Sequence, residues 1–506
     1  VTDRPHRLRT AWRHSLAMIA LALLSGCAVG PDFMRPADPP VTGYTPGRMP
    51  TRTVSAGVAG GGAQRLILGR DIPGEWWALF RSRPLKSLVE QSLKNNPDLQ
   101  AAQAALRVAR HNTAAQRGAF FPSIDGSFSA TRQKVPADIT GEVPDPSIFN
   151  VFTAQVSVSY TPDVFGANRR AVESLEAQEE AQRFQVEAAY LTLTSNIALA
   201  AIQEASLRGQ IAATQQIIKI ASDLLDLLRR QRGVGQIAEA DVVQQEAALA
   251  QIQQTLPPLQ RQLQQQRHLL TALAGRFPSQ EVSERFELAM LQLPRNLPVS
   301  LPSNLVRQRP DVRAAESNVA SASALVGVAI ANRLPNITLT ANAGSTAFEI
   351  TKLFSPQTGF WNLAGSVLQP IFRGGALMHK ELAARAALDQ AEAQYRSTVI
   401  VAFQGVADAL SAIQMDAVAL QKAVDAERAA ARSLAIVRQR LELGDVNYLA
   451  LLNAQQTYQQ ALISLVQAKA NRYADTVALF FALGGGWWNR ADIPPPQLMP
   501  AGYIFQ

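Results

Sequence analysis

Few residues in this chain of 506 have types and spacings suited to covalent or metal chemistry. The only cysteine, Cys27, has no partner for an intrachain disulfide, so its thiol is available for another reaction. The five histidines are scattered, and the sequence contains no cysteine–histidine metal spacing, phosphate-binding loop or serine elbow. We therefore expect neither an enzyme nor a metal or cofactor site.

Cys27 stands at the end of a segment with the layout of a secretory signal. Basic residues lie between Arg4 and Arg13, and a ten-residue apolar run follows from Ser15 to Leu24, too short to span a bilayer. The sequence Leu24-Ser25-Gly26-Cys27 resembles a bacterial lipobox, after which Cys27 would carry a thioether-linked lipid as the first residue of the mature chain. The alternative is a cysteine that follows an ordinary signal by chance.

This interpretation makes residues 1–26 a lipoprotein signal peptide and residues 27–84 a lipidated N-terminal segment. By analogy with bacterial lipoproteins, Ala28 in place of an aspartate favours the outer membrane. Without the signal the chain has 44 basic and 39 acidic side chains, a net charge of +5 instead of +8, which is too small to indicate a nucleic acid partner. No later segment has 18 consecutive apolar residues, so we expect no transmembrane helix.

The rest of the sequence is a duplicated unit. The motif PDLQAA at Pro97 recurs as PDVRAA at Pro310, and FPSI at residue 121 recurs as LPNI with the same offset of 213 residues. Gly235 recurs as Gly444 after 209 residues. Anchors in constant order predict two copies of one structural unit, residues 85–275 and 301–484, with a linker at 276–300 and a tail at 485–506.

Each copy begins with an expected leading helix and continues into two strands. The strands, near residues 122–132 and 151–162 and again near 335–345 and 361–370, alternate apolar residues with uncharged polar ones. A proline stands at every helix–strand junction, where it stops the helix and fixes the chain direction. These prolines are Pro122, Pro162, Pro335 and Pro370.

Long helices follow the strands. Residues 165–232 and 374–443 contain no proline and would extend ~100 Å each at 1.5 Å per residue. Shorter returning helices, 237–274 and 446–483, come after glycine-containing turns. The leading and returning helices together match the length of the long ones, so we expect them to stack end to end beside it.

The strands have the length of transmembrane β-strands, and four of them cannot close a barrel in lipid. Closure between chains would give eight strands in a dimer or twelve in a trimer, and only the larger barrel leaves room for a lumen. Two alternatives remain at this point. The helices could cover a water-soluble sheet, or the chain could be the coiled-coil stalk of an adhesin.

Several motifs together are similar to those of one family. They are PDF at residue 31, WWALF at 76, RPDV at 309, QPIFRGG at 369, GDVNYL at 444 with LNAQ at 452, and ALGGGW at 482. With the lipobox, they resemble TolC-like outer-membrane efflux factors, in particular the lipidated branch that serves resistance-nodulation-division transporters. One departure is Asn453, where the family usually has aspartate.

The resemblance implies a mixed α/β membrane channel in the outer membrane of a Gram-negative bacterium. Each chain would supply four transmembrane β-strands and long periplasmic helices, and a homotrimer would close a 12-stranded β-barrel and a 12-helix α-barrel. It also implies that the two helix-reversal turns form the periplasmic tip and contact a periplasmic adaptor (membrane fusion protein). The tip residues here are Gly233, Val234, Gly235 and Gly444.

Asp445 is the candidate gate residue, because three copies around an axis would make a carboxylate ring that favours cations. Asp241 in the first copy is a second candidate. For both, the alternative is a solvated helix N-cap.

The function implied is a passive conduit that exports drugs or other small molecules received from the adaptor and an inner-membrane resistance-nodulation-division transporter. The alternatives are a channel for type I protein secretion and a non-transporting coiled-coil lipoprotein. Outer-membrane lipid would be a further partner, and no nucleic acid is expected.

Overall fold

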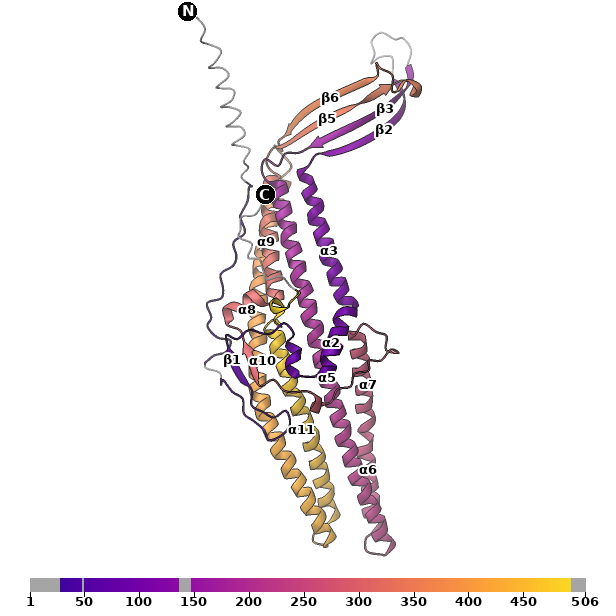
Figure 1. The fold of residues 1–506 in the computed structure, drawn as a ribbon, viewed down its shortest axis with the longest axis vertical. Helices are drawn as coiled ribbons and strands as arrows, with labels where there is room; N and C mark the ends of the chain where they lie inside the picture. Colours follow the sequence, from indigo (N-terminus) through magenta and orange to yellow (C-terminus); the bar gives the residue numbers. More distant parts are fainter. Residues whose placement is uncertain (1–27, 48–49, 136–146, 493–506) are drawn as a thin grey trace, which may run out of the picture. The chain divides into compact units, whose positions relative to one another are not determined.

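The computed structural model describes residues 28–47, 50–135 and 147–492. Cys27 and the signal segment lie outside the described residues. The chain divides into two compact units, each built from three separate stretches of sequence (Figure 1). Unit 1 takes Val1–Pro36, Leu106–Gln182 and Ala315–Tyr395, and unit 2 takes Ala37–Ala105, Arg183–Ala314 and Arg396–Gln506.

Unit 1 contains a four-stranded antiparallel sheet. Its strands are β2 (Ser123–Val135), β3 (Ser147–Tyr160), β5 (Asn336–Ala347) and β6 (Gly359–Leu368), in the order β2-β3-β5-β6. β2 and β3 are longer than expected at the end that leads to the loop between them. Each copy of the duplicated unit thus contributes one hairpin, and β3 pairs with β5 to join the two hairpins.

The register places most of the apolar residues of the four strands on one face. Val156 of β3 pairs with Gly126 of β2 and Ala343 of β5, and Ala343 pairs with Trp361 of β6. Directly paired residues in an antiparallel sheet project to the same side. The large exposed apolar side chains of the sheet that lie on this face are Ile124, Phe128, Ile148, Val156, Leu339, Trp361, Leu363 and Val367.

The opposite face is mostly polar and almost free of charge, although the exposed Leu368 also lies on it. Thr153 of β3 and Thr346 of β5 are paired, and their hydroxyl oxygens lie 3.1 Å apart in a hydrogen bond. The sheet therefore has one side suited to an apolar environment and one suited to water.

Two uninterrupted helices of 67 residues follow the strand pairs. They are α5 (Ala167–Gly233) and α10 (Ala376–Glu442), and each passes from unit 1 into unit 2. The second returning helix, α11 (Tyr448–Ala482), is also continuous.

The other helices expected to be continuous are broken at prolines. The first returning helix, expected over 237–274, is two helices, α6 (Glu239–Gln254) and α7 (Leu256–Leu273). Pro257 and Pro258 lack the amide hydrogens that a continuous helix would need, but fit the first turn of a new one. Each leading helix is likewise two helices, α2 (Arg83–Asn95) and α3 (Pro97–Arg117), then α8 (Pro302–Gln308) and α9 (Pro310–Ala331).

The leading and returning helices meet end to end within unit 2, as their lengths indicated. In the first copy, the Asn96 side chain at the α2–α3 break donates to the Leu273 carbonyl oxygen at the end of α7, at 3.1 Å. In the second copy, Arg309 at the α8–α9 break donates to the Ala482 carbonyl oxygen at the end of α11, at 2.8 Å. Equivalent residues of the two copies thus satisfy the carbonyl groups left unpaired at helix C-termini.

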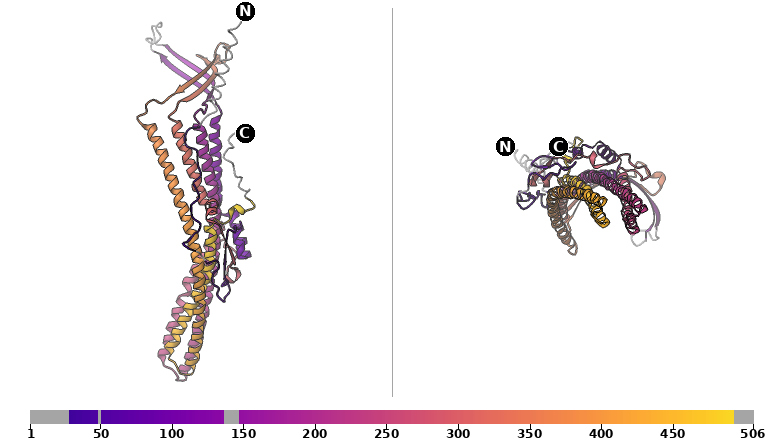
Figure 2. Two further views of the ribbon diagram at one scale, coloured as in Figure 1. Left: turned by 90° about the vertical axis from the view of Figure 1, so that its left-hand side faces the viewer. Right: turned by 90° about the horizontal axis from the view of Figure 1, so that it is seen from below.

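Unit 2 also contains a structure that the sequence pattern did not predict. We call residues 50–82 and 288–300 the belt. Within it, β1 (Arg65–Leu68) from the N-terminal segment pairs in parallel with β4 (Asn296–Val299) from the linker. In the right-hand view of Figure 2 the helices of unit 2 form a curved layer, and the indigo N-terminal segment lies on its convex side.

Two helices are long and apolar enough, by length and composition, to cross a membrane. They are Pro310–Ala331 and Ala376–Glu442. In the first, 61% of the apolar window is buried inside the protein, as in the core helix of a soluble domain. The absence of transmembrane helices therefore stays a prediction.

Candidate functional site

The four junction prolines all stand just outside a strand. Pro122 and Pro335 directly precede β2 and β5, and Pro162 and Pro370 follow two residues after β3 and β6. After Pro162, the Asp163 carboxylate accepts hydrogen bonds from the backbone amides of Asn168 and Arg169, each at 2.9 Å. This carboxylate satisfies the first free amides of α5 and complements the positive end of its dipole.

The residues that follow Cys27 are fixed to the same junction in unit 1. Arg170 of α5, whose side chain is 5% exposed, donates to the Val29 carbonyl oxygen at 3.1 Å and to the Asp32 carboxylate at 2.6 Å. A Cβ on Gly166 would lie 2.6 Å from the Ala28 Cα, so only glycine allows this approach. Ala28 therefore lies at the point where β3 ends and α5 begins.

The two helix-reversal turns have the same hydrogen-bond pattern. After α5, Gly235 donates to the Arg232 carbonyl oxygen and Gln236 to that of Gln231. After α10, Gly444 and Asp445 make the equivalent bonds to Leu441 and Arg440. Both are Schellman caps, in which Gly235 (φ 76°) and Gly444 (φ 80°) occupy the left-handed conformation.

The tip residues named from the sequence have different roles in these turns. Gly233 is the last residue of α5 and has no positive φ, so only Gly235 of this pair is the turn glycine. Val234 is 72% exposed.

Neither candidate gate residue caps a helix. The residue that caps α11 is Asn447, whose side-chain oxygen accepts from the Ala450 amide at 3.1 Å. The alternative interpretation of Asp445 as a helix N-cap is therefore wrong, since Asn447 occupies that position. Asp445 is exposed and lies 3.8 Å from the Arg440 guanidinium. Asp241 is a half-buried residue in the first turn of α6.

A buried chain of hydrogen bonds near the helix-reversal turns joins α11 of the second copy to α6 and α5 of the first copy. The Tyr448 hydroxyl of α11 donates to the Gln245 side chain of α6, which in turn donates to the Ala221 carbonyl oxygen of α5 at 2.7 Å. Burial, with a smaller contribution from Asp241, raises the pKa of Tyr448 above its usual value, so the hydroxyl keeps its proton. Leu224, Val242 and Leu451 pack around this chain, and no periodicity indicated that Tyr448 would be its centre.

Nearer the C-terminal end of α11, Arg472 fixes the belt to this helix by hydrogen bonds. Its side chain is 1% exposed and donates to Gln64 Oε1 at 2.9 Å and to the Gly62 carbonyl oxygen at 3.2 Å. Asp475 follows one turn later and faces Asp416 of α10. Burial, together with the charge of Asp416, raises the pKa of Asp475 to about 7.

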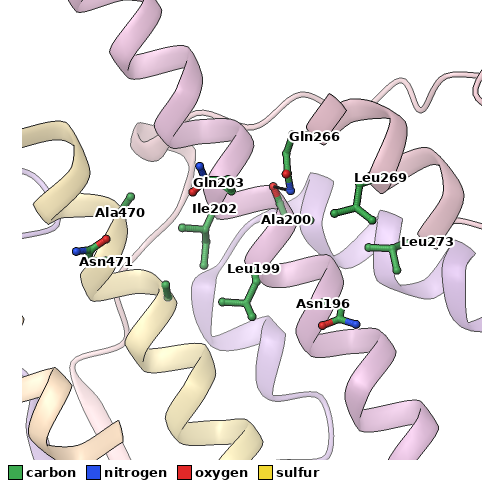
Figure 3. A pocket seen from close by; sticks show the side chains of 11 residues that line it. Asn196, Leu199, Ala200, Ile202, Gln203, Gln266, Leu269, Leu273, Ala470 and Asn471 are labelled. Carbon is green, nitrogen blue, oxygen red and sulfur yellow. Dashed lines mark hydrogen bonds between the residues drawn. The ribbon is translucent and has the colours of Figure 1, made fainter. Parts of the chain in front are cut away.

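On another side of α11, a groove of about 460 Å³ runs along α5 between α7 and α11 (Figure 3). Its lining includes Leu199 of α5 and Leu269 of α7, with carboxamide side chains beside them. None of the lining side chains is charged, so the groove offers no general acid, base or metal ligand. The carboxamide residues are Asn196, Gln203, Gln266 and Asn471.

The duplicated architecture coincides with a known family model. The model described as outer membrane efflux protein matches residues 88–276 and 301–485, one stretch in each copy. The chain belongs to the outer membrane efflux protein family. The resemblance drawn from the sequence motifs is thereby confirmed.

Curated members of the efflux protein family match along almost the whole chain. The probable efflux pump outer membrane protein SepC of Pseudomonas putida strain F1 is 30% identical over 502 residues, covering 95% of this chain and 98% of SepC. The probable efflux pump outer membrane protein TtgC of Pseudomonas putida strain KT2440 is 30% identical over 481 residues, covering 94% of this chain and 96% of TtgC.

Solved channels show the same fold. The outer-membrane channel OprN superposes with a TM-score of 0.82 at 27% identity, over 91% of this chain and all of OprN. The outer membrane protein VceC of Vibrio cholerae gives 0.76 at 26% identity, over 83% of this chain and all of VceC. This efflux protein is thus an outer-membrane channel component with a strand sheet and long helices, as predicted, and its family consists of channels rather than enzymes.

Proposed function

We propose that three copies of this efflux protein form one passive conduit, with a 12-stranded barrel in the outer membrane and a 12-helix tunnel in the periplasm. The main support is the sheet of unit 1, whose apolar face crosses all four strands in register. In the described residues, β2 and β6 each pair on one side only. Because unpaired edges are very unfavourable in lipid, the barrel must close between copies.

We further propose that Cys27 carries the lipid anchor. The contact between Ala28 and Gly166 supports this, because it brings the residue after Cys27 to the junction of β3 with α5. A barrel strand ends at the membrane surface, so an acyl chain attached here would reach the bilayer.

The partners we propose are a periplasmic adaptor at the turn residues Gly233 to Gly235 and Gly444, and an inner-membrane resistance-nodulation-division transporter. The cargo is a small molecule. Relatives named for toluene, solvent and antibiotic efflux and for pyoverdine export support small molecules over secreted proteins.

The conduit is tested by conductance of the purified protein in a planar bilayer and by cross-linking. We expect trimers and discrete channels, whereas cross-linked products no larger than a monomer, without conductance, would contradict the proposal.

Asp445→Asn tests the gate, because the loss of three carboxylates should lower cation selectivity. Asp241→Asn tests the second candidate in the same way, and unchanged selectivity in either variant would exclude a carboxylate ring at that position.

A further inference from the structure

The groove of Figure 3 lies on the side of α11 opposite the belt. Arg472 and Thr476, one turn apart, contact Gln64 of the belt, whereas Ala470 and Ala474, also one turn apart, line the groove. Two residues advance about 200° around an α-helix, so these two pairs face opposite ways.

α5 is divided in the same way. Asn196, Leu199 and Gln203 recur at spacings of three and four residues and are all exposed on one face. Ile197 and Ala201, on the other face, are 0% exposed. Since the belt segment lies on the convex side of the helical layer (Figure 2), the groove opens on the concave side, which becomes the lumen in the proposed trimer.

We propose that this groove is a transit subsite for neutral amphipathic small molecules. Leu199, Ile202 and Leu269 offer an apolar surface, and the carboxamides of Asn196, Gln203 and Asn471 both donate and accept hydrogen bonds. Its volume of about 460 Å³ falls in the range of small-molecule sites, roughly 300–1,000 Å³. The inference rests on the proposed function and adds a ligand class to it.

The lack of charge in the lining decides that class. A charged compound entering the groove would lose part of its hydration without gaining a counter-charge, whereas a neutral compound would lose little hydration free energy. The trimer would present three such grooves at one level of the tunnel, so the wall itself would favour neutral cargo.

Thiol protection tests the subsite. Ala474→Cys places a reporter in the groove, and Gln467→Cys places a control two turns earlier on the same exposed side of α11. Labelling by N-ethylmaleimide is followed site by site by peptide mass spectrometry in the detergent-solubilised full-length protein. The probe is N-phenyl-1-naphthylamine, which is neutral and has one N–H donor, and the matched anion is 1-anilinonaphthalene-8-sulfonate.

We expect the neutral probe to slow labelling of the Ala474→Cys thiol at least fivefold, and the Gln467→Cys thiol or the sulfonated probe to give less than a twofold effect. Leu199→Asp, at a position already 37% exposed, should abolish the protection. Equal slowing of both thiols, or equal protection by both probes, would overturn the inference. Conductance of the unmodified protein separates the proposed conduit from the proposed subsite. If the protein conducts but the probe does not protect the thiol, only the subsite is refuted.

Discussion

At the scale of single residues, Arg472 fixes the belt to α11, and Asp475 lies one turn away from it, facing Asp416 of α10. The buried Arg472 donates hydrogen bonds to neutral oxygens of the belt, and the carboxyls of Asp475 and Asp416 lie near enough to act on its charge. Burial and the nearby charge of Asp416 favour the protonated form of the Asp475 carboxyl. Loss of the proton would place two like charges between α10 and α11.

Asp475 should therefore make stability depend on pH. Its folded pKa of about 7 exceeds the ordinary 3.8, so between these values the folded state binds a proton that the unfolded state has released. The stabilisation that this carboxyl contributes to the folded state is fully present below about pH 4 and is lost as the pH rises toward 7. We expect the thermal midpoint of Asp475→Asn to fall less than that of wild type between pH 5 and pH 8.

The control is Asp389→Asn, at an exposed position of α10. Its midpoint should follow the wild-type pH profile. A profile of Asp475→Asn that coincides with wild type would show that the carboxyl ionises normally in the folded protein.

At the scale of elements, prolines and glycines set where the helices stop. α5 and α10 remain unbroken for 67 residues because no proline interrupts them, whereas Pro97, Pro257 and Pro310 each force a new helix to begin. The two reversals then use identical glycine caps. The duplication therefore preserves the turn geometry even though α6–α7 is broken and α11 is not.

The turn glycines can be tested with a pair of substitutions. A Cβ at Gly444 or at Gly233 would meet no atom within 4 Å, so only the backbone distinguishes them. Gly444→Ala forces a residue with a side chain into the left-handed conformation and should lower the free energy of unfolding by about 1–2 kcal/mol. Gly233→Ala, at the last residue of α5, should raise the free energy of unfolding by up to about 1 kcal/mol through helix propensity.

The measurement is hydrogen exchange of the amides around each turn. Gly444→Ala should speed exchange near residue 444, and Gly233→Ala should leave exchange near 233 equal or slower. Faster exchange in both variants would mean that packing, rather than backbone conformation, maintains the turns.

At the scale of the whole molecule, the sheet of unit 1 is incomplete within one chain. Most of its large exposed apolar side chains lie on one face, and among the residues that the structure describes its outer strands pair on one side only. Such a surface is unfavourable in water and becomes favourable only when lipid covers the face and further copies pair with the edges. Assembly and membrane insertion are therefore expected to depend on each other.

Two neighbouring residues of β6 test this. Leu363 lies on the apolar face and Asn362 on the polar face. Leu363→Arg places a charge toward lipid and should cost about 2–4 kcal/mol near the bilayer centre, whereas Asn362→Arg faces the lumen. We expect Leu363→Arg to reduce the yield of membrane-inserted trimer strongly and Asn362→Arg to preserve it. Equal yields would contradict the assignment of the two faces.

The sequence by itself determined the features that depend on local pattern. The offset repeats gave the duplication, period-two alternation gave four strands with one apolar face each, and proline-free stretches gave the long helices. The motifs gave the family. These features were accessible because backbone conformation and side-chain alternation depend on residues a few positions apart.

Only the tertiary structure decided which distant residues meet. Nothing local indicated that β1 would pair with β4, some 230 residues away. Nor did any local pattern indicate that Tyr448 of α11 would bond to Gln245 of α6, or that Asp475 would face Asp416. The groove also depends on how three helices pack together. Burial, and with it the proton affinity of Asp475, arises from contacts between segments, and a single sequence does not record which segments those are.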